Sequence, residues 1–196
     1  MPNLSTAVSL SLPDWLLDHT TTCTAPIPDA QERMRWVVEL SRQNVLAGSG
    51  GPFAAAVFDR DSHLLVAAGV NRVEPLGVSS AHAEVMALTF AQRRLGQFDL
   101  AAGGNHELIT SAQPCLMCLG ATLWSGVTRL VFGAPTVEVE SILGFDEGFV
   151  PADWIAQLTR RGIEVVGEAC REEAVAVLRL YREMAGNVYN SSRAGK

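Results

Sequence analysis

The stretch AHAEVMALTFAQRRLG, at residues 81–96, opens with a histidine and a glutamate two residues apart. Its apolar residues recur at helical spacing and a glycine ends it, so it predicts an amphipathic helix that begins near the histidine. A second stretch, QPCLMCLGATLWSG at residues 113–126, predicts a helix that begins after a proline and carries a Cys-x-x-Cys pair. Two predicted helix starts therefore carry metal-binding side chains. The residues expected to face inward on the first helix are Val85, Leu88 and Leu95.

Short apolar runs lie between the predicted helices and are typical of buried strands. The first two runs are separated only by the turn residues RDS and predict a hairpin. Further helices are predicted at 29–48 and 171–184. Because strands alternate with helices, the pattern predicts an α/β fold with three layers. The five predicted strands lie at residues 51–59, 63–71, 106–112, 129–134 and 163–167.

The length of 196 residues, 48% of them hydrophobic, suits one well-buried domain and is short for two. Residues 1–28 are rich in Thr, Ser and Pro and predict an extension that lies on the surface. Residues 29–185 then form the domain, and 186–196 form a C-terminal tail.

The charge balance and the hydropathy pattern exclude some classes of partner. The net charge of −6 argues against nucleic acid as the partner, because basic side chains supply most of the affinity for phosphates. No apolar run approaches the ~18 residues of a membrane-spanning helix, and the first residues lack the basic start of a signal peptide. We therefore expect a cytoplasmic protein, in which a close cysteine pair indicates metal or redox chemistry rather than a structural disulfide.

The metal hypothesis rests on His82, Cys115 and Cys118. Both segments begin helices, and the partial positive charge at a helix N-terminus favours the thiolate form that binds metal. Three protein ligands leave the fourth tetrahedral position of a zinc ion open, which is typical of a catalytic site. Water in that position can have a pKa of about 7, and Glu84 is placed to take its proton. The sequence therefore predicts one zinc per chain beside a general base.

Each fragment alone has a simpler explanation. His-x-Glu occurs often by chance, and Cys-x-x-Cys can be a redox pair or half of a zinc ribbon. A ribbon of four thiolates is excluded because no second Cys-x-x-Cys exists. A zinc-binding module without turnover remains an alternative, although Glu84 beside an open zinc site argues against it.

The ordered pair HAE and PCLMC resembles the signature of zinc nucleobase deaminases. The region from about Gly51 to Gly148 resembles the cytidine-deaminase-like superfamily, and within it several segments resemble bacterial guanine deaminases and relatives that act on aminated purines or triazines. The resemblance implies a mixed five-stranded sheet with helices on both faces, and a homodimer. His82 argues against the bacterial cytidine deaminases, which have cysteine there. The segments that carry the resemblance are GPFAAAVFDRD, NRVEP, SAHAEVMAL, TSAQPCLMCLGATLWSGV and GFDEGF.

The resemblance also implies a reaction. Zinc hydroxide attacks the ring carbon that bears an amine, and Glu84 moves the water proton to the neighbouring ring nitrogen. A second carboxylate carries a proton to the departing ammonia; GFDEGF places it at Glu147, with Asp146 as the alternative. For guanine the products are xanthine and ammonia.

Four further residues correspond to substrate-binding positions of the family. Asn71 resembles the asparagine that hydrogen-bonds the substrate ring, and its amide offers both donor and acceptor. Phe53 resembles the aromatic residue that stacks on the purine, and Trp124 is expected to wall the pocket. Tyr189 lies in the C-terminal tail, which can close the site of its own chain or of a partner.

Rival substrates stay open at this point. Guanosine, or a triazine such as ammeline, fits the same motifs. Deamination of tRNA adenosine shares His-Ala-Glu and a similar Pro-Cys-x-x-Cys segment, but the acidic charge and a tail with only Arg193 and Lys196 as basic residues argue against it.

Overall fold

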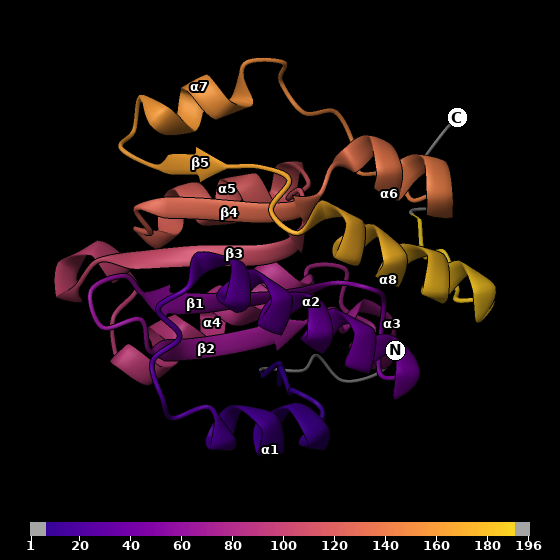
Figure 1. The fold of residues 1–196 in the computed structure, drawn as a ribbon, viewed down its shortest axis with the longest axis horizontal. Helices are drawn as coiled ribbons and strands as arrows, with labels where there is room; N and C mark the ends of the chain where they lie inside the picture. Colours follow the sequence, from indigo (N-terminus) through magenta and orange to yellow (C-terminus); the bar gives the residue numbers. More distant parts are fainter. Residues whose placement is uncertain (1–6, 191–196) are drawn as a thin grey trace.

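The computed structural model describes residues 7–190, and its centre is one five-stranded sheet in the order β2-β1-β3-β4-β5 (Figure 1). All five strands lie within the ranges that the sequence predicts, and the first two form the predicted antiparallel hairpin. The strands are β1 (Ala54–Asp59), β2 (Leu65–Val70), β3 (His106–Ala112), β4 (Arg129–Ala134) and β5 (Glu164–Val166).

The sheet is mixed, as expected. Strand β1 is antiparallel to both β2 and β3, whereas β3, β4 and β5 are parallel. Strands β2 to β5 consequently run in one direction, and β1 begins at the edge where they end. In open α/β sheets this carboxyl edge is the usual place for a ligand site.

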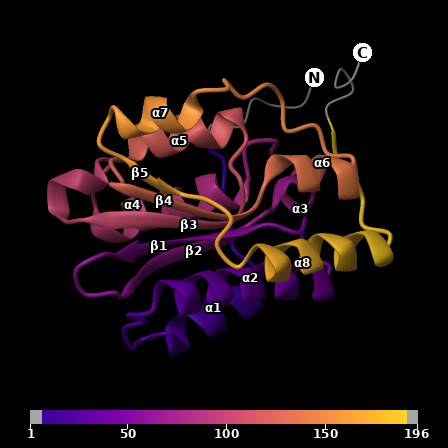
Figure 2. The same cartoon turned by 45° about the horizontal axis from the view of Figure 1, so that its top comes forward.

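Helices cover both faces of the sheet, which confirms the three-layer fold (Figure 2). Helices α1, α2 and α8 lie on one face, and α4, α5 and α7 lie on the other. The short helices α3 and α6 follow the ends of β2 and β4. The bounds are α1 (Asp14–Thr22), α2 (Ala30–Leu46), α3 (Val73–Leu76), α4 (Ala83–Leu95), the 3-10 helix η1 (Leu100–Gly103), α5 (Leu116–Ser125), α6 (Thr136–Leu143), α7 (Trp154–Thr159) and α8 (Arg171–Glu183).

Two apolar cores result from the alternation of side chains along the strands. In β1, Ala54 and Phe58 face the core under α1, α2 and α8, whereas Ala55 and Val57 face the core under α4, α5 and α7. All four side chains are fully buried, so each face of the sheet requires its helical layer.

Helix α4 lies unusually close to strand β2, and small residues make this possible. A Cβ atom at Gly69 would come within 2.4 Å of the backbone nitrogen of Ala87, which no real contact permits. The buried face of the helix is built largely from Ala83, Met86, Ala87, Leu88 and Ala91. The expectation for Leu88 is confirmed, but Val85 is only half-buried and Leu95 is exposed. The sequence prediction chose the large apolar residues as the inward ones. It missed the alanines Ala83, Ala87 and Ala91, which allow α4 to pack close to β2.

The expectation that residues 1–28 form a surface extension is wrong for part of that segment. Residues 14–22 form helix α1, whose Leu16 is fully buried in the core. The indole nitrogen of Trp15 also donates a hydrogen bond to the hydroxyl of Ser49 at 3.0 Å. Threonines have low helix propensity, so the burial of one leucine, rather than local preference, stabilises this helix. Residues 1–6 and 191–196, including Arg193 and Lys196, lie outside the described range.

Within residues 7–190, none of the helices combines the length and apolar character required to cross a membrane.

Candidate active site

The three predicted metal ligands converge at the carboxyl edge of the sheet. His82 is the residue that precedes the first turn of α4, and Cys115 occupies the same position before α5. The Nδ1 atom of His82 lies 3.6 Å from Sγ of Cys115 and 3.7 Å from Sγ of Cys118. The three donor atoms all lie within 4.8 Å of one another. One imidazole and two thiols at such spacing match the ligand types and number of a catalytic zinc site.

The pKa shifts of the two cysteine donors also favour binding of a cation. A hydrogen bond from Cys118 lowers the pKa of the Cys115 thiol to about 4, against the opposing effect of burial, with further help from His82. The pKa of Cys118 is raised well above its usual value, because its proton is bonded to Cys115 and its thiol is buried. The lowered pKa of Cys115 favours its thiolate form, and a zinc ion would supply the charge that favours the second thiolate. The residues present fit zinc, which His82, Cys115 and Cys118 would hold.

Glu84 projects into the same place from the first turn of α4. Its side chain is 6% exposed, and its Oε2 atom lies 3.3 Å from Sγ of Cys118. Burial and the negative charge of Cys115 raise the pKa of Glu84. A buried carboxyl group beside three metal donors can exchange a proton with whatever occupies the open position.

A cavity beside these donors collects most of the remaining predicted residues. Phe53, just before β1, and Asn71, just after β2, line it together with Glu147 and Tyr189. Four segments that are distant in sequence therefore meet where strands end or begin. The full lining is Phe53, Asn71, His82, Glu84, Ala112, Gln113, Cys115, Glu147 and Tyr189.

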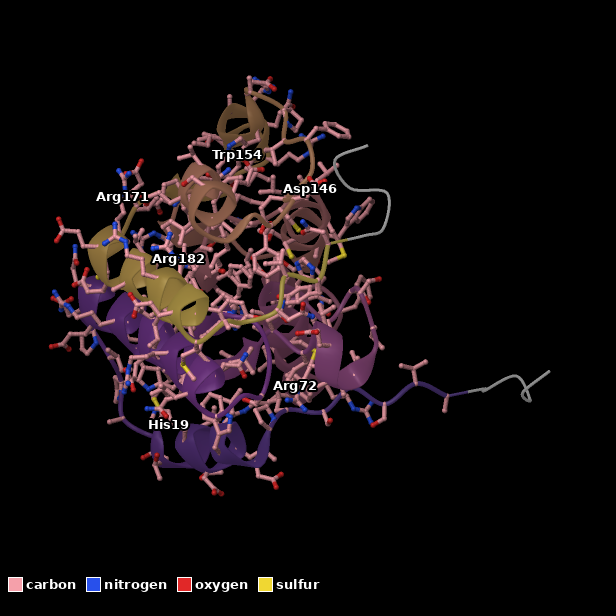
Figure 3. All side chains as sticks on the ribbon, turned by 90° about the vertical axis from the view of Figure 1, so that its right-hand side faces the viewer. His19, Arg72, Asp146, Trp154, Arg171 and Arg182 are labelled. Carbon is pink, nitrogen blue, oxygen red and sulfur yellow. The ribbon has the colours of Figure 1, made fainter. Side chains whose placement is uncertain are left out.

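The two neighbouring carboxylates Asp146 and Glu147 have different surroundings. Glu147 lines the cavity, and burial together with the negative charges of Cys115 and Glu84 raises its pKa to about 8. Asp146 is exposed, and its Oδ1 atom accepts a hydrogen bond from the backbone N–H of Gly148 at 2.9 Å. In Figure 3, Asp146 and Arg72 lie on the side of the molecule along which the C-terminal segment runs. Glu147 is therefore the carboxylate that faces the metal donors.

Asn71 and Phe53 are held firmly around the cavity. Asn71 is 1% exposed, and its Oδ1 atom accepts a hydrogen bond from the backbone N–H of Val73 at 3.2 Å. Within the described residues its side-chain nitrogen makes no hydrogen bond, so it is available to a ligand. The ring of Phe53 packs edge-on against Phe145, with ring centroids 5.5 Å apart.

Tyr189, in the C-terminal segment, lines the cavity of its own chain. Its ring packs on Phe145 at 4.8 Å, and its hydroxyl is buried beside Gly51. That hydroxyl has no hydrogen-bond partner in the described part of the chain. A buried donor without a partner is costly, so the hydroxyl favours a polar ligand in the cavity.

The prediction for Trp124 is wrong for the cavity of its own chain. The indole is 83% exposed and does not line the cavity. Nine residues separate it from Cys115, which is about two and a half turns of α-helix, so the two side chains point in opposite directions. Trp124 therefore lies on the outer face of α5.

Sequence reasoning overlooked Gln113. This residue lies between the end of β3 and Pro114, and it lines the cavity. Its Oε1 atom accepts a hydrogen bond from the backbone N–H of Thr136 at 3.3 Å, which leaves the amide nitrogen for a ligand. Gln113 could have been predicted as a site residue, because it lies at a strand end and next to the Pro-Cys-x-x-Cys segment.

Known proteins share both the motif and the whole fold. Residues 28–134, more than half of the chain, match the family model for the cytidine and deoxycytidylate deaminase zinc-binding region. A guanine deaminase of Bacillus subtilis is 34% identical over 117 residues, which cover 60% of this chain and 71% of the relative.

Two solved structures extend the similarity to almost the full length. A structure of guanine deaminase from Nitrosomonas europaea is 46% identical, with a TM-score of 0.86, covering 92% of this chain and 99% of the other. A protein solved in complex with 2,6-diaminopurine is 47% identical, with a TM-score of 0.87, covering 94% and 97%. The donor set, the fold and these matches agree: the chain belongs to the cytidine and deoxycytidylate deaminase zinc-binding family.

Proposed function

We propose that the protein is a zinc-dependent hydrolytic deaminase that converts guanine and water into xanthine and ammonia. The observation that supports the proposal most strongly is a single cavity beside the zinc donor set, lined by two carboxyl groups of raised pKa and by Asn71. Similarity to guanine deaminases supports the choice of substrate.

Glu84 is the proposed proton carrier of the first step. When bound, zinc supplies a Lewis acid that lowers the pKa of a coordinated water toward about 7. The carboxylate of Glu84 takes a proton from water and delivers it to N3 of guanine as a new C–O bond forms at C2. One group can serve as base and then as acid, and burial raises the pKa of this carboxyl, which favours its acid role.

Glu147 is the proposed donor to the leaving group. The C2–N bond breaks as the exocyclic amine takes a proton from Glu147 and leaves as ammonia, and the hydroxyl at C2 gives up its proton to become the carbonyl of xanthine, which restores the carboxyl group. A carboxyl with a pKa of about 8 carries the required proton at neutral pH. It faces the cavity from the side of the loop after α6, so the two carboxyl groups approach from different segments. Separate positions allow each carboxyl group to serve a different atom of the substrate.

Recognition of the ring falls to Asn71, Phe53 and Tyr189. The free amide nitrogen of Asn71 suits the carbonyl oxygen of a lactam, and Phe53 offers an aromatic surface. Tyr189 lines the cavity, which favours a compact free base over guanosine or a tRNA loop. The solved relative in complex with 2,6-diaminopurine supports a purine base as well.

An ammonia-release screen tests the proposed function. The substrates are guanine, guanosine, ammeline, adenine, cytosine and cytidine, with an adenosine-containing tRNA as a separate arm. We expect turnover of guanine at a kcat/KM at least tenfold above any other, in line with the similarity to guanine deaminases. Faster release from ammeline or guanosine would reassign the substrate, and silence on all of them would favour a binding module.

Exchanging the second carboxylate tests its assignment. Glu147→Gln removes the proton donor without changing its size, so kcat on guanine should fall by about 10²-fold, a typical contribution of general acid–base catalysis. Zinc content, measured by atomic absorption, should not change. Asp146→Asn is the matched control, because Asp146 is exposed and an amide oxygen can still accept from Gly148. A larger effect at Asp146 would reverse the assignment.

We also infer a cytoplasmic homodimer. The outer face of α5 exposes Leu116, Met117 and Trp124, an apolar group that a second copy could cover. Four free cysteines support a reducing compartment. Sedimentation velocity should give twice the chain mass of 21.0 kDa, and a monomer at micromolar concentration would contradict the dimer.

A further inference from the structure

The loop that carries Glu147 has few internal interactions that fix its conformation. It runs from Gly144 to Gly148, and both glycines have positive φ angles, of 77° and 73°. Glycine allows many backbone conformations, so a loop bounded by two of them is costly to order. Its one internal side-chain hydrogen bond in the described structure joins Asp146 to Gly148. Contacts from elsewhere must therefore determine where Glu147 points.

Asn190 supplies two such contacts from the C-terminal segment. Its Nδ2 atom donates to the carbonyl oxygen of Gly144 at 2.8 Å. Its Oδ1 atom accepts from the backbone N–H of Asp146 at 2.9 Å. One amide side chain thus satisfies the two backbone groups on either side of Phe145, immediately before Glu147. An amide side chain offers a donor and an acceptor on one planar group, which suits two backbone groups that lie close together.

The C-terminal segment around Asn190 is itself fixed to the domain. The hydroxyl of Tyr181, in α8, donates to the carbonyl oxygen of Asn187 at 2.7 Å. The amide of Asn187 hydrogen-bonds the carboxylate of Glu74 in α3. Phe145 packs between the rings of Phe53 and Tyr189. Asn190 therefore reaches the loop from an anchored position and can transmit that rigidity to it.

We propose that Asn190 is a positioning residue that holds the Gly144–Gly148 loop so that Glu147 faces the substrate amine. This inference rests on the proposed function of Glu147. It differs from closure of the cavity, a role that would fall to the ring of Tyr189, which lines the cavity. Asn190 is exposed and touches the loop only through backbone groups, so it acts on Glu147 and not on the substrate.

A double-mutant cycle on guanine separates positioning from closure. Asn190→Ala should lower kcat about tenfold in the otherwise unchanged protein, and less than twofold when Glu147→Gln is already present. The second change is small because Glu147→Gln has already removed the proton donor, so moving the loop costs little further activity. An equal effect in both backgrounds would mean that Asn190 serves closure or stability, and the proposal would be overturned.

A conservative variant and a distant control sharpen the cycle. Asn190→Asp keeps the acceptor for Asp146 but loses the donor to Gly144, so it should also lower kcat. Asn105→Ala is the matched control: Asn105 also bonds through its side chain, to Asp61 and Thr128, but lies before β3 at the opposite edge of the sheet. Its kcat should stay within twofold of the unchanged protein; a tenfold loss there would make the effect of Asn190 non-specific.

A measurement without turnover separates this inference from the proposed function. Hydrogen exchange followed by mass spectrometry should show faster exchange in the peptide spanning 144–148 in Asn190→Ala, and no change there in Asn105→Ala. Unchanged exchange in the loop would overturn the positioning role, whatever the activity. The protein without substitutions could be inactive on guanine while Asn190→Ala still shows faster exchange in the loop. That result would overturn the substrate assignment and leave the positioning role in place.

Discussion

Glu84→Gln is expected to leave the zinc in place and to lower kcat on guanine by at least about 10³-fold. The amide has the size of the carboxylate but cannot accept and return a proton, so both the activation of water and the protonation of the ring fail together. General acid–base groups typically contribute 10²–10⁴-fold, and a group that serves both steps belongs in the upper part of that range. Steady-state ammonia release and zinc content on the same preparation measure the two quantities.

The control for this variant is Glu39→Gln. Glu39 lies on α2, outside the cavity, and pairs with Arg42 at 2.7 Å on the surface. Such exposed pairs contribute little, so kcat should stay within twofold. If Glu84→Gln turned over at a normal rate, Glu84 would not be the proton carrier. If the variant lost its zinc, the role of Glu84 would be to stabilise the metal site.

Removal of zinc is expected to abolish turnover while the protein stays folded. All three donors belong to the N-terminal ends of α4 and α5, and apolar contacts with the sheet hold both helices. Activity should therefore fall by at least about 10³-fold after chelation and return on addition of one equivalent of zinc, with circular dichroism unchanged. His82→Ala should reproduce the loss without a chelator, since two thiols alone hold zinc weakly.

Zinc binding should also depend on pH. Burial alone would lower the pKa of His82, but its hydrogen bond to Cys115 and the nearby charge of Glu84 raise it. The raised pKa values of His82 and Cys118 mean that protons compete with zinc for these two ligands, so zinc affinity should fall as the pH decreases.

Cys23→Ser is the matched control for the metal experiments, because this half-buried thiol lies outside the donor group. It should bind one zinc and keep its activity. Full activity in chelated protein, or zinc lost from the Cys23 variant, would contradict the assignment of the site.

The sequence by itself determined the sheet and the metal donors. Strand and helix periodicity is a local property, and it located all five strands and the two helices that begin at the site. His82, Cys115 and Cys118 could be predicted because each lies within the first turn of a helix or directly before it. Such positions need no knowledge of long-range packing.

Only the tertiary structure decided which residues accompany the donors in the cavity. Glu147 and Asp146 are adjacent in sequence, and the path of the loop and its contacts with the C-terminal segment turn one inward and the other outward. Trp124 points outward because α5 packs on the core through other residues, among them Leu119 and Thr122. Helix α1 forms because the core buries Leu16, although its own residues favour helix weakly. In each case the position of the residue or helix depends on contacts between segments far apart in the chain. A local sequence pattern does not indicate such contacts.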